Sequence, residues 1–275
     1  MLRKAYLNAM KGLEAGLKVR DIAVFDLSDC VPEERIGVVR GRVDRYDFDN
    51  VPVRDNGIVG VVEDIKNYDP DDRVGDVMRP LAEPMLIAGS VSLVSFLPRI
   101  AEQPYRLVVD AERIDAVVTP SDVVQLPVRL LVFTLLVHLE ETMRDLIRYR
   151  VGDDDQRILG ALDPDARRHI KRLLRRHARS NLNPSPLDVT GFMDKANLLF
   201  DLRVIPERDG ERELLRELRD LRNKVDHVQD YAESREQLAR FLYLVEAMQQ
   251  WIERLANEFP PGTIVTGEAA SAAAM

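Results

Sequence analysis

The sequence YDFDNVPVRDNGIVGVV at residues 46–62 has a counterpart, YRLVVDAERIDAVV, at residues 105–118. In both segments a run of apolar, mostly β-branched residues leads to a turn that contains aspartate and then to a second such run. This pattern predicts two β-hairpins that belong to one internally repeated unit. Further short apolar runs predict strands at Ile36–Val39 and Met85–Ile87, and the pattern of Val91–Ile100 predicts a helix between strands.

A short polar segment, Thr119-Pro120-Ser121-Asp122, stands between the second hairpin and an apolar helical pattern. A hydroxyl at a strand end can meet a phosphate beside a helix N-terminus, and an aspartate three residues later can accept both hydroxyls of a ribose. The alternative is structural: Thr119 or Ser121 caps the helix, and Asp122 complements its dipole. The residues by themselves leave both interpretations open.

The repeated hairpins and the terminal Thr-x-x-Asp resemble a pair of CBS domains. The resemblance covers about residues 18–126, with repeats at about 18–66 and 73–126. It implies an α/β pseudo-dimer with an adenosyl ligand such as AMP, ADP or ATP in a cleft, and Thr119 and Asp122 as nucleotide-binding residues.

The two copies depart from that family pattern in different ways. In the first copy Glu63 and Lys66 stand where a hydroxyl and a carboxylate are expected, and Glu63 would repel a phosphate. In the second copy Ala116 replaces the usual glycine. We therefore expect at most one nucleotide site, served by Thr119 and Asp122.

Beyond about residue 126 long helical patterns dominate, which predicts an α+β protein of two domains. Residues 1–126 form the α/β domain and residues 127–259 an all-α bundle of about five helices. The run Leu126–Leu139 is apolar on all sides, which predicts a central buried helix, continuous with the helix after Asp122 except at Pro127. Residues 260–275 have no large apolar residue before the terminal methionine and are expected to be disordered.

Two apolar stripes at helical spacing mark the end of the bundle. They contain these residues: Leu214, Leu218, Leu221, Val225 and Val228 in the first, and Leu238, Phe241, Val245, Met248, Ile252 and Leu255 in the second.

The segment Leu221-Arg-Asn-Lys-Val-Asp-His227 lies on the first of these helices. It resembles the Arg-Asn-x-x-x-His motif of HEPN domains, helical bundles of which many are metal-independent ribonucleases. The resemblance covers about residues 127–259 and implies Arg222, Asn223 and His227 as catalytic residues. On a straight helix Arg222 and His227 lie about 140° apart, so two copies of the chain facing each other across a two-fold axis would supply both groups to one phosphate.

The chemistry of this motif suits RNA cleavage by the 2′-hydroxyl. His227 can take the 2′-hydroxyl proton or protonate the leaving 5′-oxygen, Arg222 can stabilise the charged phosphorane, and Asn223 can orient either group. No metal is required, and the product is a 2′,3′-cyclic phosphate. The alternative is that Arg222 pairs with Asp226 one turn on and His227 is an ordinary exposed residue. The same Arg-to-His spacing also occurs at Arg172 and His177.

A basic segment, Asp163–Arg179, provides a candidate RNA-binding face. Its cations are Arg167, Arg168, Lys171, Arg172, Arg175, Arg176 and Arg179, whereas a stripe of Ile170, Leu173, Leu174 and Ala178 is expected to be buried. The alternative is a solvated face that pairs with acidic helices such as Glu211–Asp220.

The composition excludes several classes of function. The net charge of −8 and the pI near 5.2 argue against a general polyanion-binding protein. One cysteine, Cys30, excludes a disulfide framework, and the four histidines show no metal-ligand spacing, so no metal site is predicted. The N-terminus lacks the pattern of a signal peptide and no apolar run spans a bilayer, so we expect a cytoplasmic protein without membrane contact.

The sequence thus predicts a dimeric endoribonuclease whose cleft geometry is biased by an adenine nucleotide on the CBS pair. The resemblance further implies a stress-response or phage-defence toxin, with an inhibitory partner protein as one option. The alternative function is non-catalytic: an RNA- or protein-binding helical module with a CBS sensor or dimerisation domain.

Overall fold

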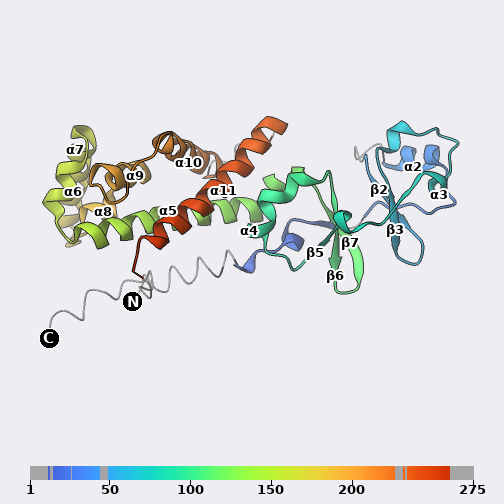
Figure 1. Cartoon of the computed structure of the whole chain (residues 1–275), viewed down its shortest axis with the longest axis horizontal. Helices are drawn as coiled ribbons and strands as arrows, with labels where there is room; N and C mark the ends of the chain where they lie inside the picture. Colours follow the sequence, from blue (N-terminus) through green and yellow to red (C-terminus); the bar gives the residue numbers. More distant parts are fainter. Residues whose placement is uncertain are drawn as a thin grey trace. The chain divides into compact units, whose positions relative to one another are not determined.

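The structure is a computed structural model that describes residues 12, 15–25, 27–43, 49–226, 232 and 234–260 (Figure 1). Residues 15–128 form one compact unit, and the residues from 129 onward form most of a second. His227 and Val228 of the predicted motif and stripe, and the tail beyond residue 260, lie outside the described residues.

The first predicted hairpin consists of β2 (Val51–Arg54) and β3 (Ile58–Val62), which pair antiparallel with Val51 opposite Val62. The chain turns through Asn56, whose positive φ of 55° suits asparagine. A third strand, β4 (Arg79–Pro80), joins the outer side of β3. Burial of alternating valines on this hairpin forms a core with the helix that precedes it.

The second predicted hairpin consists of β6 (Arg106–Asp110) and β7 (Arg113–Val118), with Leu107 opposite Val117. Two further strands complete a four-stranded sheet in the order β1-β7-β6-β5. Here β1 (Val24–Phe25) pairs antiparallel with β7, and β5 (Leu86–Ala88) pairs parallel with β6. Both predicted hairpins are therefore confirmed.

The two copies exchange a strand. β1 belongs to the first copy but pairs with the hairpin of the second, whereas β4 belongs to the second copy but pairs with the hairpin of the first. The parallel bridge between Cys30 and Val53 in the first copy matches the parallel pairing of β5 with β6 in the second. Because each sheet contains a strand that belongs to the other copy, neither copy completes its sheet alone.

The strand predicted at Ile36–Val39 is wrong: these residues begin the helix α2 (Ile36–Val43). Ile36, Val39 and Val43 are fully buried at steps of three and four, which is one face of a helix and not the alternation of a strand. The helix predicted at Val91–Ile100 is present as α4 (Leu93–Phe96) followed by the 3₁₀ helix η5 (Leu97–Glu102). The remaining short elements of this unit are η1 (Val19–Asp21), η3 (Ile65–Asn67), α3 (Val74–Val77), η4 (Glu83–Met85) and η6 (Pro120–Val124).

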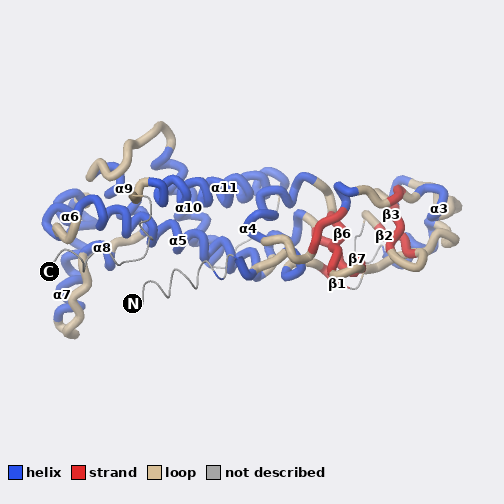
Figure 2. The backbone as a smooth tube through the Cα atoms, turned by 60° about the horizontal axis from the view of Figure 1, so that its bottom comes forward, coloured by secondary structure: helices blue, strands red, loops and turns tan. Residues whose placement is uncertain are grey.

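After residue 125, all regular secondary structure in the described part of the chain is helical (Figure 2). Seven α-helices are described there, where about five were predicted. They are α5 (Leu126–Val151), α6 (Asp155–Ala161), α7 (Pro164–Ala178), α8 (Pro186–Val189), α9 (Phe192–Asp201), α10 (Glu211–Asp226) and α11 (Arg235–Asn257). In the last predicted stripe, Phe241, Val245, Met248 and Leu255 are buried, whereas Leu238 and Ile252 are half-buried.

The prediction that Leu126–Leu139 is buried on all sides is wrong. Leu126 and Leu130 remain 61% and 50% exposed, and Phe133 is 40% exposed. The helical path is also interrupted at Gln125, which has extended backbone, and not at Pro127, which fits in the first turn of α5. Leu131, Leu135 and Leu139 provide the buried face of this helix.

On α10 the buried stripe is rotated slightly from the predicted one. Leu218, Leu221 and Val225 are buried as expected, but Leu215 is fully buried whereas Leu214 is only half-buried. The rotation leaves Asn223 exposed and Arg222 at the border of the buried face.

Candidate functional site

The Thr-x-x-Asp segment begins at the end of β7 and forms the single 3₁₀ turn η6. Asp122 is 8% exposed and its Oδ2 accepts hydrogen bonds from the Thr119 backbone N–H at 2.6 Å and from Thr119 Oγ1 at 2.9 Å. Thr119 Oγ1 also lies 2.7 Å from Ser121 Oγ. The structural alternative, a capped helical turn, is therefore present in the molecule.

The capping bonds still leave Asp122 some capacity for a ligand. Its Oδ1 accepts a third hydrogen bond, from Gln125 Nε2 at 2.7 Å, and Gln125 Nε2 also donates to the carbonyl of Ile22. A carboxylate has about four acceptor positions, so three bonds leave about one. Asp122 can thus accept one hydroxyl of a ribose, where the sequence suggested two.

A cavity of about 530 Å³ opens beside this turn and is lined by both copies of the repeat. The first copy contributes Asp49 and Asn50, and the second contributes the Thr119–Asp122 turn. Apolar side chains supply much of the remaining wall and include Val24, Pro52, Val61, Leu107 and Val117. This size and this combination of apolar walls with a few polar groups are typical of small-molecule sites.

In the first copy, Glu63 stands where the second copy has its hydroxyl-bearing turn, and its carboxylate is already engaged. Glu63 accepts a hydrogen bond from Tyr105 Oη at 2.9 Å and pairs with Arg79 at 3.1 Å. Burial and the nearby Glu63 carboxylate raise the pKa of Tyr105, so this phenol stays a donor at neutral pH. Because Glu63 already has two partners, the first copy offers no equivalent acceptor turn.

In the helical unit the structure gives Arg222 a partner that the sequence did not indicate. Arg222 Nη1 donates to Glu140 Oε2 of α5 at 3.0 Å, and the Arg222 side chain remains 37% exposed. The exposed Asn223 follows it on α10. His227, the third residue of the motif, lies outside the described residues.

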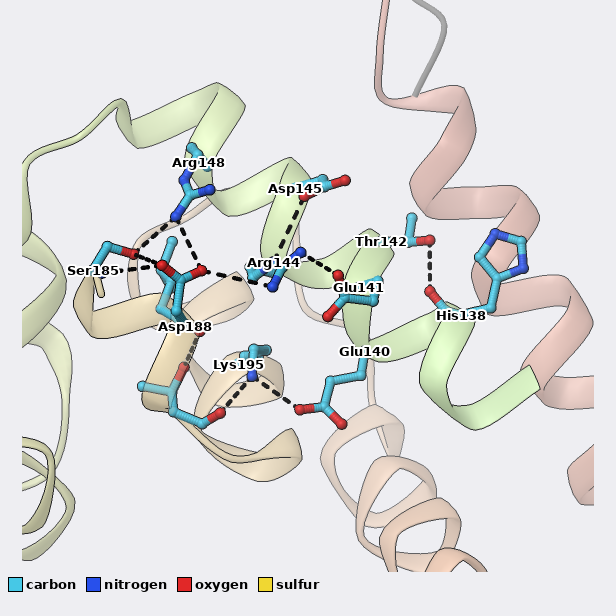
Figure 3. A network of polar contacts seen from close by, with 12 residues as sticks. His138, Glu140, Glu141, Thr142, Arg144, Asp145, Arg148, Ser185, Asp188 and Lys195 are labelled. Carbon is cyan, nitrogen blue, oxygen red and sulfur yellow. Dashed lines mark hydrogen bonds and ion pairs between the residues drawn. The ribbon is translucent and has the colours of Figure 1, made fainter. Parts of the chain in front are cut away.

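Glu140 is held in turn by a buried lysine (Figure 3). Lys195, whose side chain is 4% exposed, donates to Glu140 Oε1 at 2.9 Å and to the backbone carbonyl of Thr190. A buried ammonium group is costly unless it is paired. Lys195 therefore fixes the Glu140 carboxylate, and the carboxylate fixes one edge of the Arg222 guanidinium.

A second network in the same picture joins α5 to the N-terminus of α8 (Figure 3). Arg148 Nη2 donates to Ser185 Oγ at 2.8 Å and to Asp188 Oδ1 at 3.3 Å, and Arg144 lies 3.6 Å from the same carboxylate oxygen. Burial alone would raise the pKa of Asp188, but the Ser185 amide and the two arginines lower it below its usual value. These interactions tie α5 to α8.

The basic helix α7 differs in part from the prediction. Arg167 donates to the carbonyls of Gly160 and Leu162, and Arg168 pairs with Asp165, so both act within the fold. The other five cations are exposed and form no ion pair with a described residue; they are Lys171, Arg172, Arg175, Arg176 and Arg179.

The apolar stripe of α7 is also narrower than predicted. Of its four predicted residues Ile170 is buried, Leu173 and Leu174 are half-buried, and Ala178 is exposed. Burial of the stripe thus decreases toward the C-terminal end of the helix, where several of the exposed cations lie.

The part of the chain that the structure describes contains no candidate metal site, no membrane-spanning helix and no reactive thiol. No cluster of His, Cys, Asp or Glu there could hold a metal ion, and no helix there is long and apolar enough to cross a bilayer. Cys30 is buried, and burial together with the Glu34 carboxylate raises the pKa of its thiol to about 12. A thiol with such a pKa is not a nucleophile at neutral pH.

Comparison with known proteins gives similarity over part of the chain. No family model and no curated protein matches it. One solved structure that resembles it is the CBS domain of a bacterial CNNM/CorC family Mg²⁺ transporter in complex with ATP; the identity is 20% over 46% of this chain and 97% of that chain, with a TM-score of 0.36. Another is CBSX2 in complex with AMP; the identity is 23% over 40% of this chain and 94% of that chain, with a TM-score of 0.33. A third is a proposed archaeal homologue of g-AMPK from Methanocaldococcus jannaschii (19% identity, 44% of this chain, TM-score 0.34), of which this chain covers 51%.

Proposed function

We propose that the N-terminal unit is a tandem CBS pair with one adenosyl site, and that this site regulates a metal-independent endoribonuclease of HEPN type in the helical unit. The observation that carries the proposal is the cavity built from both copies of the repeat, with the Thr119–Asp122 turn on one side and Asp49 and Asn50 on the other. ATP and AMP, bound in two of the similar structures, give the first ligands to test.

The cavity has a group for each part of an adenosyl ligand. Its apolar walls suit the base, and the remaining acceptor position of Asp122 suits a ribose hydroxyl. Thr119 and Ser121 place two hydroxyls beside it. The first copy has Glu63 engaged with Tyr105 and Arg79, which supports a single site.

The helical unit is proposed to cleave RNA through Arg222, Asn223 and His227. His227 accepts the proton of the 2′-hydroxyl, and the 2′-oxygen attacks the adjacent phosphorus. The bond to the 5′-oxygen breaks as the protonated imidazole gives its proton to that oxygen. The products are a 2′,3′-cyclic phosphate and a 5′-hydroxyl. Arg222 stabilises the charged intermediate with the edge that Glu140 does not hold.

Two chains are proposed to share this cleft. Arg222 and His227 are five positions apart in the sequence, which places them about 140° apart around a straight helix. A second copy related by a two-fold axis would bring its own His227 toward this Arg222. The dimer is tested by the molecular mass of the chain in solution.

A cleavage assay on mixed RNA in EDTA tests the nuclease. Wild type is compared with His227→Ala and Arg222→Ala, and with Arg219→Ala as a matched control, since Arg219 is an exposed arginine on the same helix that pairs with the adjacent Asp220. Cleavage that both motif variants lose and the control retains supports the proposal. Equal cleavage by wild type and His227→Ala contradicts it.

Calorimetry with adenosyl compounds tests the ligand site. Asp122→Ala is expected to abolish binding, whereas Asp115→Ala, which removes an exposed carboxylate from β7, is expected to leave it unchanged. Binding that is unaffected by Asp122→Ala would place the ligand elsewhere.

The second candidate function is a non-catalytic RNA-binding module beside the same sensor. The specific observation in its favour is the face of α7, where five exposed cations have no acidic partner among the described residues. RNA binding without cleavage in wild type, retained in His227→Ala, would favour this function.

A further inference from the structure

Another cavity, of about 530 Å³, lies within the helical unit at the C-terminal end of α7. Helices α6, α7 and α8 lie side by side there (Figures 1 and 2). The cavity is lined by the end of α7, the loop that follows it and the N-terminus of α6. Neither the proposed adenosyl site nor the proposed nuclease motif includes it.

Part of the wall of this cavity is apolar. The aliphatic side chains that line it are Leu174, Ala178, Leu182 and Pro184, and Leu182 remains 55% exposed. The volume is in the range of small-molecule sites. Side chains of this kind can also cover the flat face of a nucleobase that has left its stack.

Exposed cations border the cavity. Arg175 lines it, and Arg172 and Arg179 lie three positions before and four positions after Arg175, on the same side of α7 and at its end. All three are exposed, and none of them forms an ion pair with a described residue. Guanidinium groups bind phosphate oxygens, so a strand held by these arginines would have its bases beside the cavity.

The cavity also contains a carboxylate that lacks a donor. Asp155, the first residue of α6, lines it, and its side chain makes no hydrogen bond or ion pair with a described residue. Desolvation and the neighbouring Asp153 carboxylate raise the pKa of Asp155. N–H donors from a ligand would therefore stabilise the ionised group.

Among the four RNA bases, guanine fits this carboxylate best. An ionised carboxylate only accepts hydrogen bonds, and its two oxygens can accept from two parallel N–H groups. Guanine has N1–H and the N2 amino group side by side on its Watson–Crick edge. Adenine and cytosine have an acceptor nitrogen beside their amino group, and uracil has one N–H between two carbonyls. Asn183, which also lines the cavity, has an amide N–H for guanine O6.

We propose that this cavity binds an unpaired guanine of single-stranded RNA through Asp155, while the arginines of α7 hold the adjacent phosphates. The inference rests on the proposed RNA-binding face of α7 and adds a base preference to it. The cations supply affinity for any sequence, and the cavity supplies the selection.

Binding of short labelled RNAs to the full chain tests the preference. The probes are an all-uridine RNA and the same RNA with one central guanosine, adenosine or inosine. All have fluorine in place of the 2′-hydroxyls, so that the proposed cleavage cannot occur. We expect the guanosine RNA to bind at least about fivefold more tightly than the uridine and adenosine RNAs. Inosine lacks the N2 amino group and should lose most of this gain.

Two variants separate the base from the phosphates. Asp155→Asn should abolish most of the guanosine preference, because its amide presents one acceptor and not two, and should leave the salt dependence of binding unchanged. Arg172→Ala should weaken binding of all the RNAs alike and lower the slope of log affinity against log salt by about 0.7, while the preference remains. Asp209→Asn, the same change at an exposed carboxylate outside the cavity, is the matched control and should leave the preference unchanged.

The outcomes separate this inference from the function on which it rests. If the guanosine and uridine RNAs bind equally to wild type and Arg172→Ala weakens both, the base site is wrong and the RNA-binding face stands. A preference that survives in Asp155→Asn would overturn the assignment of the base to this cavity. If none of the RNAs binds, the RNA-binding face of α7 itself is wrong.

Discussion

Arg222 and Glu140, 82 positions apart in the sequence, meet at 3.0 Å between α10 and α5. The other oxygen of Glu140 accepts from the buried Lys195 of α9, so one carboxylate ties three helices together. The guanidinium of the proposed catalytic motif is thus held at one edge and 37% exposed. The same carboxylate, Glu140, therefore both joins the packed helices and orients the guanidinium that is proposed to contact RNA.

Glu140→Gln is expected to lower the free energy of unfolding by about 3 kcal/mol, because it leaves the ammonium of Lys195 buried without a counter-charge. Glu140→Gln combined with Lys195→Met removes both charges and is expected to recover part of that loss. Urea denaturation of the wild type, both single variants and the double variant measures the coupling. Additive losses would show that the two side chains are not coupled.

The exposed cations of α7 are expected to bind RNA mainly through its phosphates. Replacing Arg172, Arg175 and Arg176 together by alanine should weaken binding and reduce the slope of log affinity against log salt by about 2, at about 0.7 per lost contact to a single strand. Filter binding at several salt concentrations measures both effects. The control is Arg168→Ala, since Arg168 already pairs with Asp165 and should contribute little. A triple variant with unchanged affinity would contradict RNA binding by this helix.

The fold was predictable where turn residues mark the ends of the strands, and it was not where an apolar run is too short to show its period. The two hairpins followed from runs of β-branched residues around Asp-containing turns, and Asn56 and Ala111 have positive φ at those turns. Ile36–Val39 was misassigned because a four-residue apolar run does not distinguish a strand from a helix. The repeat indicates the correct assignment, because the helical pattern of Val91–Ile100 in the second copy occupies the position that Ile36–Val39 has in the first.

The candidate site was predictable only where its residues are close in sequence. Thr119 and Asp122 meet within one turn, and the predicted capping interaction is local. Glu140 and Lys195 carried no signal, because their contacts with each other and with Arg222 depend on how α5, α9 and α10 pack. The same holds for Asp49, which reaches the cavity of the other copy through the tertiary fold.

Acid should weaken the N-terminal unit through Glu34. Its carboxylate accepts from Arg42 Nη1 at 2.9 Å and from the Val31 N–H at 2.9 Å, and the bond from Arg42 lowers the pKa of Glu34 below its usual 4.5. A depressed pKa in the folded state gives stability that is complete above the unfolded pKa and is lost as pH falls through the folded one.

Glu34→Gln, which cannot ionise, is the comparison for this pH effect. We expect the wild type to be more stable than Glu34→Gln at about pH 6, and the difference to shrink or vanish at about pH 3. Unfolding free energies at both pH values measure this. A difference that stays constant between them would show that the Glu34–Arg42 pair contributes nothing through ionisation.

The exchanged strand β4 leaves no room for a side chain at Gly60, so replacing this glycine should destabilise the fold. A Cβ at this position would lie 2.6 Å from the Arg79 carbonyl oxygen, so Gly60→Ala must push β4 away from β3. We expect a loss of about 2 kcal/mol in the free energy of unfolding, in the range of overpacked sites. The control is Gly57→Ala in the neighbouring turn, where an added Cβ would meet nothing within 4 Å.

The equivalent position of the second hairpin is Ala116, which already pairs with Phe25 of β1. The four-stranded sheet therefore tolerates a Cβ where the three-stranded sheet does not, and Ala116→Gly should cost only the packing of one methyl group and some backbone entropy, about 1 kcal/mol. Thermal unfolding of Gly60→Ala and Ala116→Gly tests the asymmetry. Equal small losses would mean that β4 can shift without cost, and that the exchange of strands does not fix the first copy against the second.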